Sequence, residues 1–201
     1  MLVKHNNNSI SDITIPGSLA QGKMTLISSQ TASGSASIEF TSGIDSSYPI
    51  YRFEFINCHA QTSTADFTMN LSTDGGSSYN VAKTTTYFLA YQFESGSASG
   101  LSYRTGSDLA QGTGFQTIAH NQGNNNDDSW CGEMKLFNPS STTFVKHFIS
   151  TAQHTGGSVA GSYQRFMAGY GNTTSSINAI KFQMSSGNID SGTIKLYGIG
   201  D

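Results

Sequence analysis

The side chains that could do chemistry in this 201-residue chain lie in polar loops and do not form a catalytic motif. Paired carboxylates cleave glycosides when they lie about 5 to 10 Å apart across a cleft. Asp127 and Asp128 are adjacent in the chain, so we do not expect them to face one substrate together. Serine is so abundant that any serine–histidine pairing is uninformative, and no Gly-x-Ser-x-Gly or His-Glu-x-x-His motif occurs. We therefore expect a non-enzymatic protein without a cofactor.

Thiols and acidic residues give no strong metal signal either. Cys58 and His59 are adjacent, but Cys131 has no second His or Cys at the spacing that zinc sites use. Residues 124–128 (Asn-Asn-Asn-Asp-Asp) could offer oxygen ligands to calcium, yet they lack the ordered alternation and glycine of an EF-hand loop. We expect no metal, and two small buried thiols rather than a Cys58–Cys131 disulfide.

Aromatic and amide residues in loops are the more promising set, because rings cover apolar sugar faces while amides bond to hydroxyls. The polar segment Ser95–Asp128 is predicted to be a long insertion, which is usually functional or disordered. From this region we predict a receptor- or glycan-binding set made of Tyr103, Asn125, Asp127 and Trp130. The alternative is that such rings cap the core with their polar atoms outward. His120 and His154 stand in polar surroundings and are expected to be solvated.

The elements that must position these residues are strands, because apolar and polar residues alternate with a period of two. In Tyr51–Phe55 the rings share one strand face and the charges share the other. The same alternation recurs at Met24–Leu26, Ile38–Phe40, Phe67–Leu71, Met134–Leu136, Ile180–Met184 and Ile194–Leu196. Asp74-Gly75-Gly76 is typical of a tight hairpin. About ten short strands are predicted and no long helix, with a short turn near Ser107–Gln111.

This pattern predicts an all-β fold, an antiparallel two-sheet β-sandwich, with jelly-roll topology favoured and an up-and-down barrel as the alternative. Residues 22–201 are expected to form this single domain. Residues 1–21 are predicted to be an N-terminal arm or linker that lies on a neighbouring subunit, with Ile13-Thr14-Ile15 as an extended piece stopped by Pro16.

The charge balance argues against two classes of partner. The chain has 10 Lys and Arg against 13 Asp and Glu, and its formal net charge is −3. Nucleic-acid binding rests mostly on clustered basic residues, and so does attraction to an anionic membrane. No apolar run reaches the roughly 20 residues of a membrane span, and the first residues lack the apolar stretch of a signal peptide. We expect no nucleic-acid partner, no membrane partner and no export by a signal peptide.

Four segments, taken in order, carry a resemblance to a known family. They are Tyr51–Asn57 (YRFEFIN), Leu71–Tyr79 (LSTDGGSSY), Leu136–Ser141 (LFNPSS) and Met184–Ile199 (MSSGNIDSGTIKLYGI). Together they resemble a family of virion structural proteins of tailed bacteriophages, of a type frequent in marine phages. The resemblance extends from about Gly22 to the C-terminus, and the closing segment is its most specific part. It implies a phage-particle protein and brings no catalytic residues with it.

What the resemblance implies is a protein assembled in the host cytoplasm and built into the virion beside other virion proteins. Combined with the loop aromatics and amides, it predicts a homotrimer on the tail or its fibres that presents a host-adsorption surface for a cell-surface glycan. The alternative is a capsid decoration, or cement, protein that stabilises the phage head. A glycan depolymerase is a third possibility, which the missing acid pair disfavours.

Overall fold

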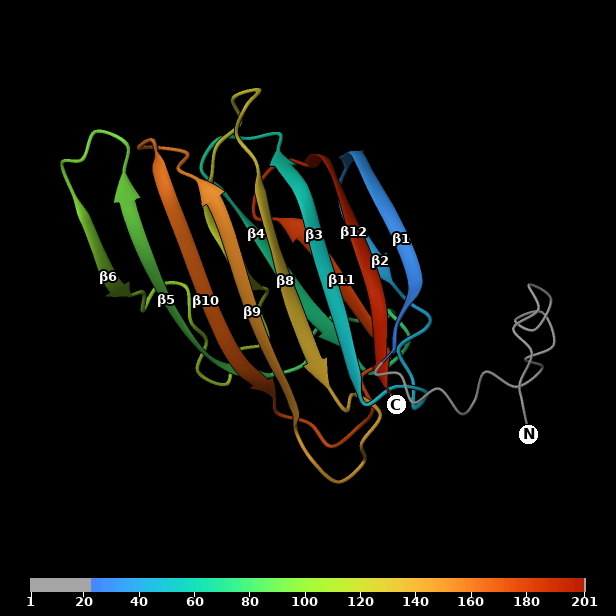
Figure 1. Ribbon diagram of the computed structural model, residues 1–201. Helices are drawn as coiled ribbons and strands as arrows, with labels where there is room; N and C mark the ends of the chain where they lie inside the picture. The colour runs from blue at the N-terminus through green and yellow to red at the C-terminus, as the bar shows by residue number, and fades with distance from the viewer. Residues whose placement is uncertain (1–22, 201) are drawn as a thin grey trace, which may run out of the picture.

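The computed structural model describes residues 23–200, which fold into twelve strands (Figure 1). The strands are β1 (Lys23–Ser35), β2 (Ile38–Phe40), β3 (Ile50–Ala60), β4 (Ala65–Ser72), β5 (Lys83–Phe93), β6 (Ser99–Tyr103), β7 (Gln116–Gln122), β8 (Trp130–Phe137), β9 (Lys146–Thr155), β10 (Gly161–Gly171), β11 (Ala179–Met184) and β12 (Ile189–Gly200). This part of the chain contains no helix, and hence none that could cross a membrane.

Two antiparallel sheets pack face to face, which confirms the predicted β-sandwich. The larger sheet has the order β1-β12-β3-β8-β9-β10-β5-β6 and lies in front of the smaller sheet, β2-β11-β4-β7, in Figure 1. Because both sheets are open at their edges, the described residues do not form an up-and-down barrel. The chain crosses repeatedly between the sheets, as it does in a jelly roll, but the larger sheet has twice the four strands of a jelly-roll sheet. Jelly-roll topology therefore stays a prediction.

The core lies between the sheets and is built from the alternating residues that the sequence singles out. Tyr51, Phe53 and Phe55 of β3 are at most 1% exposed, and Phe182 of β11 packs against the last two rings at centroid distances of 5.3 and 5.2 Å. Ile194 and Leu196 of β12 are buried, as predicted. The alternation in β1 does not mark a core face, because Met24 and Leu26 are 44% and 52% exposed on the outside of the larger sheet.

Two expectations about loops are wrong. Asp74-Gly75-Gly76 lies in the crossing from β4 to β5, which belong to different sheets, so the segment does not close a hairpin. Residues 95–128 are not an insertion, since they contain β6 and β7, and β7 is an edge strand of the smaller sheet. The strand β7 was not predicted because its buried residues include the polar Gln116 and Gln122, which break the apolar alternation. A turn does lie near the predicted position, since the Ser107 N–H donates a 3.1 Å hydrogen bond to the Arg104 carbonyl oxygen. The predicted arm, residues 1–21, lies outside the described residues.

Candidate functional site

A bulge in β3 moves two polar side chains out of the core. The register of β3 with β8 shifts between Phe55 and Cys58, and Asn57 there has a φ of 48°. The bulge inserts an extra residue, so Cys58 and Ala60 continue the buried row while Asn57 and His59 point outward. The opposing strand β12 accommodates the bulge at Gly192, which has a φ of 124°.

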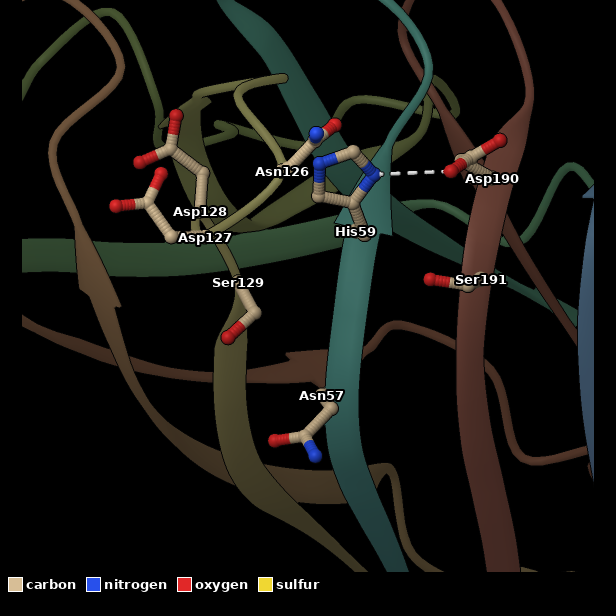
Figure 2. Close-up of a pocket in the computed structure, with 8 residues that line it drawn as sticks. All are labelled: Asn57, His59, Asn126, Asp127, Asp128, Ser129, Asp190 and Ser191. Carbon is tan, nitrogen blue, oxygen red and sulfur yellow. Dashed lines mark hydrogen bonds and ion pairs between the residues drawn. The ribbon is translucent and has the colours of Figure 1, made fainter.

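The outward residues line a polar hollow near the ends of β3, β8 and β12 (Figure 2). Its volume is about 440 Å³. We call it the first hollow, and its lining residues are Asn57, His59, Asn126, Asp127, Asp128, Ser129, Asp190 and Ser191. Amide, hydroxyl, carboxylate and imidazole groups thus surround a single open space, and none of the lining residues is a large apolar side chain.

His59 connects three chain segments at this hollow. Its Nδ1 lies 3.1 Å from Asp190 Oδ2 on β12, and its Nε2 lies 2.9 Å from the main-chain oxygen of Asn125. Figure 2 shows the contact between His59 and Asp190. The ring therefore holds the loop between β7 and β8, residues 123–129, against the larger sheet.

Asp128 stabilises the 123–129 loop through hydrogen bonds within the loop. Its Oδ2 accepts hydrogen bonds from the backbone N–H and the side-chain amide of Asn125, at 3.1 and 2.9 Å. Its Oδ1 accepts a 3.0 Å bond from the Thr155 hydroxyl at the end of β9. Gly123 leaves room for this carboxylate, because a Cβ there would lie 2.1 Å from Asp128 Oδ2. The loop is consequently fixed to both β3 and β9.

A second hollow lies beside the same loop, toward β5 and β9, and has a volume of about 340 Å³. It shares Asp127 and Asp128 with the first hollow, and its other lining residues are Glu94, Asn125, Thr155, Gly156, Gly157, Ser158 and Ala160. Tyr163 supports its rim by donating a 3.1 Å hydrogen bond to the Val159 carbonyl oxygen. The 123–129 loop thus carries polar side chains into two neighbouring hollows.

His154 underlies this region and is not solvated, contrary to expectation. It is fully buried in β9, where its ring stacks on Tyr163 at a centroid distance of 5.1 Å. Burial, reinforced by the positive charge of Arg165, lowers the pKa of His154 to about 4. His120 is partly exposed on β7, where its Nδ1 lies 2.9 Å from Asp66 Oδ1 without meeting hydrogen-bond geometry. These rings are parts of the scaffold.

The structure separates the four residues predicted to bind a receptor. Asn125 lines the second hollow and Asp127 lines both. Tyr103 is 49% exposed on the edge strand β6, lines neither hollow, and donates a 2.6 Å hydrogen bond to Asp108. Trp130 requires a correction, because it is 1% exposed and packs on Phe55 and Phe67 at centroid distances of 4.8 and 4.6 Å. Its ring is part of the core and does not reach a surface ligand.

Two site residues, His59 and Asp190, did not figure among the predicted binding residues. Asp190 lies in the closing segment 184–199 and is the residue that meets the histidine. The available signal was the interrupted alternation after Phe55, where Ile56-Asn57-Cys58-His59 no longer follows a period of two. Such an interruption inside a strand indicates a bulge, and bulges re-aim side chains.

The two thiols lie on opposite sides of the larger sheet. Both are free, with Cys58 buried as predicted and Cys131 exposed, contrary to prediction. Burial, with a smaller contribution from Cys131, raises the pKa of Cys58 to about 12. Among residues 23–200, no three His, Cys, Asp or Glu side chains are grouped so that they could hold a metal ion. What the hollows offer is hydrogen bonding to a polar ligand.

Comparisons of the chain with protein-family models, with curated proteins and with solved structures find no match. The fold and the two hollows are therefore the grounds on which a function is proposed.

Proposed function

We propose that this chain is a non-enzymatic structural protein of a bacteriophage virion, displayed on the tail or its fibres, whose two hollows contact a glycan on the host surface. The resemblance of the closing segment, residues 184–199, to phage virion proteins supports the virion assignment. That segment spans most of β12, whose Asp190 and Ser191 line the first hollow.

The observation that carries the adsorption role is the pair of hollows around the 123–129 loop. A glycan is recognised through many hydroxyl groups, each of which both donates and accepts hydrogen bonds. Asn126, Ser129 and Asn57 offer donors and acceptors, while Asp127 offers acceptors only. Two hollows on the two sides of one ordered loop suit successive sugars of a chain. Weak contacts of this kind gain strength when several copies bind together.

The arrangement of the first hollow supports a binding role over a catalytic one. Both ring nitrogens of His59 are engaged, one with Asp190 and the other with the Asn125 carbonyl oxygen, so the ring has no free nitrogen to exchange a proton with a ligand. Asp128 is occupied in the same way by Asn125 and Thr155. Groups that are held by the protein position a loop, whereas general acid–base catalysis needs a group within reach of the reacting proton.

Competition with phage adsorption tests this proposal. Purified protein is expected to bind host cells and to reduce the adsorption of intact phage, and Asn126→Ala with Asp127→Ala should weaken both effects at least tenfold. Asn80→Ala is the matched control, because Asn80 is exposed in the β4–β5 crossing and lines neither hollow. Folded protein that neither binds host cells nor competes with phage adsorption would refute the proposed adsorption role.

The position on the particle needs a separate experiment, since a capsid decoration protein would have no adsorption role. Immunogold electron microscopy of intact phage with antibody against the purified chain is expected to label the tail or fibre tips. Label over the head would contradict the tail position and favour the decoration alternative. No label on accessible particles would contradict the virion-surface assignment itself.

A further inference from the structure

The outer face of the larger sheet, defined as the side turned away from the smaller sheet, carries two apolar flanks. On β1, Met24 and Leu26 are 44% and 52% exposed. On the other flank, Ile149 of β9 is 52% exposed, Leu101 of β6 is 73% exposed and Phe88 of β5 is 38% exposed. Soluble monomers rarely leave such residues side by side over a broad area.

A central strip of charged residues separates the flanks. Arg52 of β3 makes ion pairs with Glu54 at 3.0 Å and with Glu133 of β8 at 2.8 Å, and Lys135 lies 3.4 Å from Glu133. In the register of the sheet, Arg52 is opposite Lys135 while Glu54 is opposite Glu133. On β3 and β8 the strip therefore consists of a basic row and an acidic row that run parallel, across the strands, while on β12 Lys195 lies opposite Glu54 in the acidic row.

Both rows continue onto the apolar flank of β9, β10 and β5. The basic row leads to Ile149, Ala168 and Thr86, and the acidic row leads to Thr151, Phe166 and Phe88. The first of these continuations holds a hollow of about 440 Å³ over Ala168, with Tyr170 and His147 among its walls. The second holds the stacked rings of Phe88 and Phe166, whose centroids are 4.8 Å apart. A hollow and an aromatic pair thus lie in adjacent rows.

From this arrangement we infer that the outer face binds a second copy of the same chain, around a two-fold axis that runs across the strands between the two rows. Such an axis lays the basic row of one copy on the acidic row of the other. Arg52 then faces Glu54 of the second copy, and Lys135 faces Glu133. The same operation places the Phe88–Phe166 pair of each copy over the hollow at Ala168 of the other. The face is thus complementary to itself in both charge and shape, as an isologous interface requires.

The size of the face fits this occupant. Eight strands about 4.8 Å apart span about 38 Å, and three outward side chains along each strand span about 21 Å, which gives a face of about 800 Å². A standard protein–protein interface buries about 800 Å² on each partner. The mutual ion pairing within the strip leaves little net charge, so the face has no strong attraction for an acidic or a basic partner. Two sheets that pack in this way place each strand of one copy over the same strand of the other.

Sedimentation velocity of the full chain tests the pairing, with a dimer as the expected species in place of the homotrimer that the family resemblance predicts. Ala168→Trp fills the hollow with an apolar side chain on the outside of the sheet and should yield a monomer. Ala36→Trp, in the exposed β1–β2 connection, is the matched control and should remain a dimer. A dimer that survives Ala168→Trp would overturn the proposed geometry, and so would a wild-type trimer or monomer.

Charge reversal gives a second test that does not depend on loss of association alone. In a dimer of Arg52→Glu, residue 52 of one copy and residue 54 of the other would both be acidic. In a dimer of Glu54→Arg both would be basic, so each variant by itself should be monomeric. Mixed in equal amounts, the two variants should form a mixed dimer, because each reversed residue then faces its opposite charge. Recombination also proves that both variants are folded. Variants that dimerise alone, or that fail to pair when mixed, would contradict the two-fold arrangement. A wild-type monomer that dimerises only after removal of residues 1–22 would show that this segment covers the face instead.

Discussion

Arg165 Nε donates a hydrogen bond of 3.0 Å to His154 Nε2, and both side chains are buried between the sheets. A guanidinium group is only a donor, so this contact requires His154 Nε2 to be unprotonated. The other ring nitrogen, Nδ1, lies 2.5 Å from the Thr155 carbonyl oxygen and carries the proton. The fold thus fixes His154 as one neutral tautomer, and burial and the charge of Arg165 oppose a second proton on the ring.

This pair predicts a loss of stability in acid. The unfolded chain binds a proton at His154 near the ordinary pKa of 6.5, whereas burial and Arg165 lower the folded-state pKa to about 4. The unprotonated His154 therefore contributes fully to the free energy of unfolding well above pH 6.5. This contribution is lost as the pH drops toward 4, and the loss amounts to at most ~3 kcal/mol. Urea unfolding between pH 7 and pH 4 measures this dependence.

Two variants assign the acid sensitivity to His154. His154→Gln keeps polar atoms in the site but cannot gain a charge, so its free energy of unfolding should vary less over this pH range than that of the wild type. His147→Gln is the control, since His147 is exposed on the same strand. Equal pH dependence in the wild type and in His154→Gln would contradict the assignment.

Gly192 is predicted to be irreplaceable by alanine. A Cβ at this position would lie 2.6 Å from Cys58 Cα, and the φ of 124° is one that other residues rarely adopt. Gly192→Ala should lower the free energy of unfolding by more than ~2 kcal/mol and disturb the bulge that aims Asn57 and His59. Gly114→Ala, where a Cβ would meet nothing within 4 Å, is the control. Thermal unfolding of the two variants would refute the prediction if their losses were similar.

The two cysteines should differ sharply in reactivity. A thiolate is the reactive form, and burial raises the pKa of Cys58 to about 12, while Cys131 is exposed. In the native protein at pH 8, a maleimide reagent is expected to label Cys131 within minutes and Cys58 only after unfolding. Mass spectrometry of peptides locates the label, with Cys131→Ser as the control. Rapid native labelling of Cys58 would mean that the β3–β8 region opens readily.

Removal of the His59 ring should loosen the 123–129 loop without unfolding the sandwich. His59→Ala deletes the contacts to Asp190 and to the Asn125 carbonyl oxygen, whereas Asp128 still links the loop to Thr155. Amide hydrogen exchange in residues 123–129 is expected to accelerate at least tenfold, with little change in the core strands. Asn126→Ala, which removes a lining residue with no hydrogen bond to the loop anchors, should leave the exchange rates nearly unchanged. Uniform acceleration over all strands would indicate global destabilisation instead.

The sandwich could be predicted because the rings of β3 and the apolar residues of β11 and β12 alternate strictly, and a strand with one buried face requires that pattern. β7 could not, since its buried Gln116 donates a hydrogen bond to the Ser107 carbonyl oxygen and accepts one from the Thr85 hydroxyl. Such partners come from distant parts of the chain and leave no local signal. The outward alternation of Met24 and Leu26 has the same period as an inward one, so a single strand cannot reveal which face is buried.

The candidate site was only half predictable for a related reason. Asn125 and Asp127 stand out as a polar run before the tryptophan, and they do line the hollows. Trp130 was misplaced because a tryptophan after a polar loop looks the same in sequence whether it begins a buried strand or ends an exposed loop. The meeting of His59 and Asp190, 131 positions apart, depends on the pairing of β3 with β12, which no local pattern specifies.

The first and last strands of the described chain are neighbours, since Lys23 of β1 is paired with Gly200 of β12. During synthesis, β12 is the last of the twelve described strands to leave the ribosome, yet it joins β1 to β3 within the larger sheet. Until it emerges, β1 has no partner there and one edge of β3 remains open. The larger sheet therefore cannot be completed before residues 189–200 have emerged, and a fold with such distant pairings is expected to form in milliseconds to seconds rather than microseconds.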